Sequence, residues 1–174
     1  MTATAANPQA VSGYFLSCLA RTLGYAEALV RDIPADQFAH MPHPQMNHPA
    51  FIMGHLSIYP DRLLKMVGRA ELVREISGYA DLFSAAAKCL DQPGLYPPKD
   101  EIVGYYMERY RTIRDVVAQL PDEVFTRENP MEGRLKELFP TIGGAVNFML
   151  NNHNMMHLGQ ISAWRRAVGL GPAV

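Results

Sequence analysis

Along four long stretches of the chain, apolar residues recur every three or four positions, the spacing of one face of an α-helix. The stretches are residues 7–31, 47–68, 99–120 and 141–168. Asn7 and Pro8 form a helix-start signal, Thr141 can cap the last helix, and Gly169 can end it. No stretch has the sustained alternation of a strand. The pattern predicts an all-α protein, and four helices with one apolar face each favour a four-helix bundle.

The connections between these helices contain many prolines. Three prolines in residues 32–46 exclude a regular helix there, and Pro60 predicts a kink inside the second helix. Residues 70–98 form an irregular connection between the second and third helices, with a short helix expected over 80–89. With no repeat and no long linker, residues 1–174 are expected to form a single domain.

The helical period predicts which side chains face the core. In the second helix they are Phe51, Ile52, His55, Leu56, Tyr59, Leu63, Met66 and Val67. In the fourth they are Val146, Met149, Leu150, His153, His157, Gln160, Ile161, Trp164 and Val168. Cys18 and Cys89 are expected to be small buried residues, because two distant cysteines indicate no disulfide framework. Arg165 and Arg166 are expected to complement the dipole at the end of the last helix.

Composition and charge exclude several classes of protein. Hydrophobic residues make up 48% of the 174-residue chain and charged residues 19%, as in ordinary globular proteins. The net charge of −1 gives no basic surface for nucleic acid or an anionic membrane. No uncharged segment reaches the ~18 residues of a membrane span, and the first 13 residues do not resemble a secretion signal. A cytoplasmic protein is expected.

Two histidines stand on the expected apolar face of the last helix, in the stretch NNHNMMHLGQISAWRR (residues 151–166). His153 and His157 are four residues apart, so their side chains share one face and can reach one metal ion. A histidine on an apolar face is more often a core residue satisfied by hydrogen bonds, and the pair alone does not exclude that interpretation.

A third histidine favours the metal interpretation. His55 also lies on an apolar helix face, and metal sites are often built from side chains on facing helices of a bundle. His40, His43 and His48 are weaker candidates because they lie in or beside the proline-rich loop, where solvated side chains are expected. Four aromatic residues are expected to pack in the core: Tyr59, Tyr106, Tyr110 and Trp164.

Two segments of the sequence resemble a known family. NHPAFIMGHLSIYPDRLL (residues 47–64) is similar to the second-helix signature of the DinB/YfiT-like superfamily. HNMMHLGQISAWRRAVGLGP (residues 153–172) is similar to its last-helix signature. The resemblance implies a four-helix bundle, often a homodimer, in which three histidines hold a divalent metal ion. Carried over to this chain, the ligands are His55, His153 and His157, and Gly159 and Gln160 take helix-packing and supporting positions.

Members of this family include metal-dependent thiol transferases that use low-molecular-weight thiols. The resemblance therefore implies a small-molecule partner, such as a thiol, and a transition metal such as nickel, zinc or iron. Three neutral histidines leave open positions on the ion, which can lower the pKa of a thiol or activate water. We expect a thiol S-transferase. A hydrolase remains open, with Asp61 as a general base only if the kink directs it inward, as does a non-catalytic stress-response or ligand-binding protein.

Overall fold

The computed structural model describes residues 10–173, and within that range every regular element is a helix. The α-helices are α1 (Ala10–Arg31), α2 (Pro49–Ser57), α3 (Tyr59–Met66), α4 (Tyr79–Phe83), α5 (Lys99–Val117), α6 (Asp122–Thr126), α7 (Arg134–Leu138), α8 (Ile142–Asn147) and α9 (His153–Ala167). The all-α prediction is confirmed. The expected start of the first helix at Asn7 lies outside the described residues.

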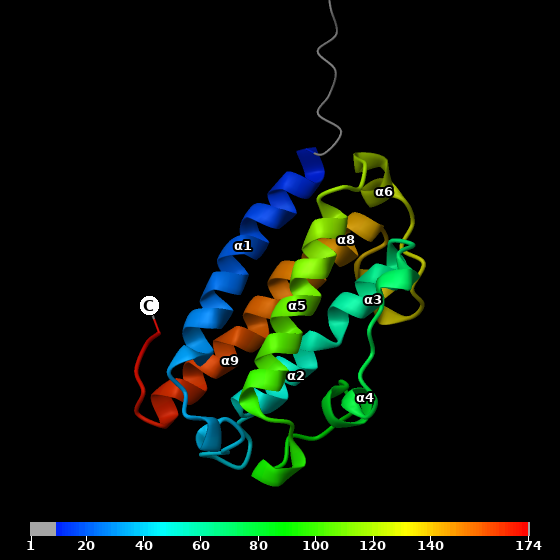
Figure 1. Cartoon of the computed structure of the whole chain (residues 1–174). Coiled ribbons are helices and arrows are strands. Elements are labelled where there is room, and N and C mark those ends of the chain that lie inside the picture. The colour runs from blue at the N-terminus through cyan, green and yellow to red at the C-terminus, as the bar shows by residue number, and fades with distance from the viewer. Residues whose placement is uncertain (1–9, 174) are drawn as a thin grey trace, which may run out of the picture.

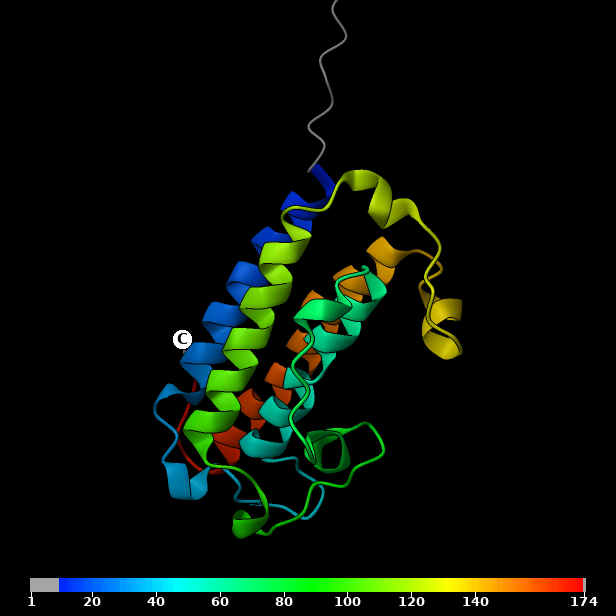
Figure 2. The same cartoon turned by 45° about the vertical axis from the view of Figure 1, so that its right-hand side comes forward.

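The long helices run side by side and enclose the core. Helix α1 packs against α5 and α9, and α2 packs against the opposite side of the same two helices (Figure 1). The connection that carries α7 lies to one side of the long helices (Figure 2). Fully buried side chains fill the space between them, including Leu19, Ile52, Tyr106, Tyr110, Ile113, Ile161 and Trp164.

The second expected helix is two helices, α2 and α3, which meet at Ile58. Pro60 lies in the first turn of α3, where the missing N–H of a proline costs nothing. The cap of α2 is His48, whose Nδ1 accepts the backbone N–H of Phe51 at 3.1 Å. All nine residues of α2 are buried, so this helix has a buried surface all round instead of one apolar face.

The fourth expected helix is also interrupted. Thr141 caps α8 as predicted, with its Oγ1 accepting the N–H of Gly144 at 3.3 Å. A π-helical turn, Phe148–Asn152, then joins α8 to α9. The chain leaves α9 through Gly169, whose φ of +82° favours glycine.

Three smaller predictions were wrong. The short helix expected over 80–89 covers only α4, because the chain becomes extended at Ser84. The third helix ends at Val117, and the connection after it contains α6 and α7. Cys18 is exposed and Cys89 is half-buried, because Cys18 lies on the outer face of α1 while its neighbour Leu19 faces the core.

Two ion pairs that the sequence did not predict connect the helices. Asp61 in α3 accepts hydrogen bonds from Arg109 in α5, and both side chains are almost fully buried, with 4% and 1% exposed. Arg165 lies in the last turn of α9, as predicted. It is buried, pairs with Asp32 and donates to the Leu29 carbonyl at 2.8 Å. The hydrogen bond that Arg165 donates to the Asp32 carboxylate lowers the pKa of Asp32 to about 2.

A search of the described helices for a segment of sufficient length and hydropathy to span a membrane finds none.

Replacing Arg109 by methionine tests the buried ion pair. The variant leaves the Asp61 carboxylate buried without its cation, so we expect the free energy of unfolding to fall by about 3–5 kcal/mol in urea titrations. The control is Arg114→Met, which removes an exposed pair with Asp115 and should cost less than about 1 kcal/mol. Equal effects of the two substitutions would show that the Asp61 pair does not hold α3 on α5.

Candidate metal centre

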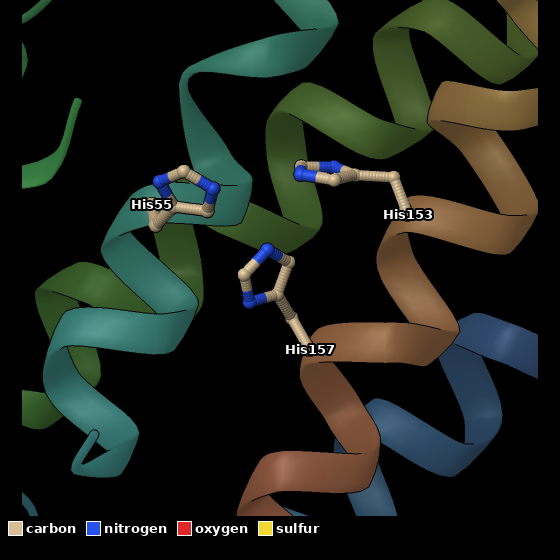
Figure 3. Close-up of side chains that lie close together, drawn as sticks. All are labelled: His55, His153 and His157. Carbon is tan, nitrogen blue, oxygen red and sulfur yellow. The ribbon is translucent and has the colours of Figure 1, made fainter. Parts of the chain in front are cut away.

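Helices α2 and α9 bring together three histidines that are far apart in the sequence. His55 projects from α2, and His153 and His157 project from successive turns of α9, so that the three rings converge (Figure 3). The ring centroids are 4.6 Å apart for His55 and His157, 4.7 Å for His153 and His157, and 5.4 Å for His55 and His153. One nitrogen from each ring lies within 4.8 Å of the other two. This group can hold a metal ion.

Aromatic side chains flank the cluster. Phe51 and Tyr59 lie one turn before and after His55, and their ring centroids are 6.2 Å and 4.9 Å from that of His55. Tyr59 also meets His153 edge to face, with 4.4 Å between centroids. These contacts restrict the rotation of the imidazole rings, because side chains packed on both sides leave few rotamers.

A backbone carbonyl sets the tautomer of His55. The Nδ1–H of His55 donates to the carbonyl oxygen of Phe83, at the end of α4, at 2.7 Å. The Nε2 atom therefore carries the lone pair, as a metal ligand requires. Histidines that bind metals usually donate their other N–H in this way, which fixes the ring and increases its basicity.

Close packing at Gly54 makes the hydrogen bond between His55 and the Phe83 carbonyl possible. The ring of Phe83 lies directly over Gly54, so a Cβ atom there would overlap three of the ring carbons. Phe83 is fully buried. The glycine before His55 therefore allows α4 to approach α2 closely enough for the Phe83 carbonyl to reach the imidazole.

The other two histidines each have a buried nitrogen without a partner. In the described part of the chain, nothing forms a hydrogen bond with the Nδ1 atoms of His153 and His157. Burial of a polar atom without a partner costs free energy, about 1–3 kcal/mol on protein scales. A divalent ion bound through these nitrogen atoms would offset that cost, and three imidazoles are a common donor set for such an ion. The residues fit a metal.

All three imidazoles are neutral at physiological pH. Burial, with smaller contributions from the His157 and His55 rings and from Arg62, lowers the pKa of His153 to about 3. Burial and then the His55 ring lower the pKa of His157 to about 4, although the Gln160 side chain acts in the opposite direction. Burial also lowers the pKa of His55. A metal ion binds only the unprotonated ring, so the lowered pKa values keep the cluster ready for it.

The histidines lie in the wall of an open cavity of about 570 Å³. Its other walls come from the loop before α2, from α2 itself and from the segment after α4. The lining residues are Met41, Pro44, Gln45, Asn47, Phe51, His55, Tyr59, Ser84, Ala85, Ala87, Lys88, Cys89, His153 and His157. The volume is that of a pocket for a small molecule.

The charged side chains described at this cavity are positive. Lys88 is its one charged lining residue among those the structure describes, and no aspartate or glutamate lines it there. Arg62 lies close by, with its guanidinium 4.8 Å from the centre of the Tyr59 ring. The site therefore favours negatively charged ligands.

The weaker histidine candidates lie outside the cluster. His40 and His43 are exposed, as the loop position predicted. The prediction for His48 was wrong, because this ring is fully buried and its Nε2–H donates to the Leu90 carbonyl at 3.2 Å. Gln160 is exposed and accepts a hydrogen bond from Asn47 at 3.2 Å. Asp61 is occupied by Arg109 and does not line the cavity.

One part of the cavity wall, formed by the segment that joins α4 to α5, was not predicted from the sequence. The residues Ser84 to Cys89 have no helical period, so nothing in their order indicated that they line a cavity with the histidines. Gly54 was the residue that could have indicated a segment packed at this place. A glycine inside an apolar helix often marks a close approach of another segment, and here that segment is the end of α4.

Substitution of Gly54 by alanine should weaken metal binding. The added methyl group displaces the Phe83 ring and with it the carbonyl that holds His55, and loss of such a supporting hydrogen bond typically costs 10- to 100-fold in metal affinity. Isothermal titration calorimetry with Zn²⁺ measures the change. The control is Gly104→Ala on α5, where a Cβ meets no described atom within 4 Å. A G54A protein that binds Zn²⁺ as tightly as the parent would contradict the role of Phe83.

The stability of the metal-free protein should depend on pH through the cluster. Free histidine titrates near pH 6.5, whereas His153 and His157 stay neutral to about pH 3 and 4 when folded. Between these values the unfolded chain binds more protons, so acidification favours unfolding. When a chelator keeps the protein free of metal, we expect the free energy of unfolding, measured by urea titration, to fall as the pH drops from about 6.5 to about 5. Most carboxylates titrate below this range. A double variant, His153→Gln with His157→Gln, should show a shallower slope, and an unchanged slope would contradict this origin.

Comparison with known proteins agrees with this arrangement. No curated protein matches the chain. The model of the DinB superfamily matches residues 19–161, which contain most of the helices described above and all three histidines of the cluster. The chain therefore belongs to the DinB superfamily.

Proposed function

We propose that the protein is a divalent-metal-dependent enzyme of the thiol S-transferase type, with His55, His153 and His157 as the metal ligands. The observation that carries the proposal is the convergence of three neutral imidazoles in the wall of an open cavity. Three protein ligands leave positions free for a substrate, as in catalytic sites, whereas structural sites usually have four protein ligands.

The metal supplies one property, which is its positive charge: it lowers the pKa of a thiol bound to it and so increases the fraction of reactive thiolate at neutral pH. The residues of the chain do the rest. The Phe83 carbonyl holds the His55 ring in the required tautomer. Phe51 and Tyr59 restrict the rings, and the cavity around them encloses the thiol and its electrophilic partner.

The lining of the cavity supports a thiol substrate over water as the nucleophile. Hydrolysis of most substrates needs a general base, and in the described part of the cavity the only histidines are the three proposed ligands. Asp61, the one carboxylate close to α2 in the sequence, is paired with Arg109. A thiol needs less help, because its pKa is far below that of water.

The alternative is a non-catalytic protein that binds a ligand through the same metal. An enclosed, uncharged cavity would favour that role. The cavity here is open and carries Lys88, which favours an anionic substrate that enters and leaves. The choice among nickel, zinc and iron depends on availability in the cell, since imidazole ligands accept each of them. The homodimer that the family resemblance implies stays a prediction.

Metal analysis tests the ligand assignment. Purified parent protein should carry about one divalent ion per chain, and the variants His55→Ala and His153→Ala should lose it, because two imidazoles bind such an ion far more weakly than three. Elemental analysis by mass spectrometry measures the content. The control is His43→Ala in the exposed loop, which should keep the metal. If the two ligand variants kept the parent content, the assignment would be wrong.

A screen of the metal-loaded protein against low-molecular-weight thiols and electrophiles tests the activity. We expect metal-dependent conjugation with at least one pair, abolished in H153A and retained in H43A. Binding of thiols without turnover across the panel would instead support the non-catalytic role.

A further inference from the structure

Lys88 is a cation without a partner at the cavity. Its side chain is exposed and lines the cavity that contains the three histidines, and it forms no ion pair with any residue in the range 10–173. The nearest carboxylate in sequence, Asp91, accepts the backbone N–H of Met41 at 3.1 Å. The ammonium group of Lys88 is therefore available to a ligand.

The backbone beside Lys88 is held in place from two sides. The Leu90 carbonyl accepts the Nε2–H of His48, and the Leu90 N–H donates to the hydroxyl of Tyr96 at 2.8 Å. The His48 and Tyr96 rings also meet edge to face, with 4.6 Å between their centroids. These contacts attach Leu90, two residues after Lys88, to the start of α2, the helix that supplies His55.

The rest of the wall has no charge that would compete for an anion. Met41, Pro44 and Phe51 provide apolar surface, and Gln45, Asn47 and Ser84 provide neutral hydrogen-bonding groups. The cavity therefore has three parts: the histidines, a neutral and largely apolar body, and one cation.

We propose that the cavity selects thiols that carry a carboxylate, with the sulfur at the three histidines and the carboxylate paired with Lys88. The proposal rests on the metal-dependent thiol function above and adds the residue that discriminates between substrates. Lys88 is a specificity residue here, because it contacts the end of the substrate that does not react.

Paired thiols that differ in one group provide the test. Protein loaded with Co²⁺ is titrated with 3-mercaptopropionate and with 3-mercapto-1-propanol, and the thiolate-to-cobalt absorption reports binding without turnover. We expect the carboxylate thiol to bind about three to ten times more tightly, the range for one partly solvated charge pair with a hydrogen bond. The preference should shrink in 1 M KCl, where charges are screened within about 3 Å.

Variants assign the preference to one residue. Lys88→Gln should abolish it, Lys88→Glu should reverse it, and Lys88→Arg should retain it, while affinity for the neutral thiol stays unchanged. Lys136→Gln on α7 is the matched control and should leave the preference intact. If Arg62→Gln abolished the preference and K88Q kept it, the assignment to Lys88 would be overturned.

Two further outcomes separate the inference from the proposed function. Equal affinity of the parent protein for both thiols overturns the role of Lys88 and leaves the thiol function in place. No spectral change with either thiol overturns both. Propionate is the last control, because a cobalt spectrum that responds to it as strongly as to 3-mercaptopropionate would place the carboxylate on the metal and not at Lys88.

Discussion

The structure depends on holding three uncharged imidazoles together between two helices that are separated by most of the chain. Each ring brings polar nitrogens into the wall of the cavity, where some of them are buried, and a buried polar atom needs a partner. The Phe83 carbonyl accepts the His55 Nδ1–H, whereas the Nδ1 atoms of His153 and His157 have no hydrogen-bond partner among the described residues. The three rings lie against one another, so their arrangement depends on the separation and rotation of α2 and α9.

Two irregular points in the helices set that rotation. The break at Ile58 ends α2 just after His55, and the π-helical turn ends just before His153. A π turn contains an extra residue, so it rotates the helix that follows relative to the one before it. Buried positions accordingly recur every four residues across the turn, at Val146, Leu150, Asn154 and Leu158. The two histidines of α9 stand beside this buried row, where they face the cavity and still contact the core.

This turn explains what the sequence could and could not predict. The helical period located all four long helical stretches and placed His55, His153 and His157 on inner faces, and the structure brings the three together. A projection with a constant 3.6-residue period cannot include a π turn, so it assigned Gln160 to the core and missed Asn154 and Leu158.

Three other features that the sequence did not predict share a different cause. Their structure is set by contacts with residues distant in the sequence, which no local pattern reports. The burial of Asp61 depends on Arg109, 48 positions away, and that of Arg165 on Asp32. His48 looked like a loop residue, yet it uses one ring nitrogen to cap α2 and the other to hold Leu90.

The wall of the cavity is held in a different way from the histidine cluster. The proposed ligands stand on helices, where packing fixes their geometry, whereas most of the cavity wall comes from irregular segments attached to those helices by a few hydrogen bonds. Substitutions in such segments can change the charge and shape of a cavity without moving the reactive centre. The proposed ligands therefore depend on α2 and α9, whereas the proposed preference for a carboxylate depends on Lys88, a residue of an irregular segment for which the helical pattern of the sequence gave no indication.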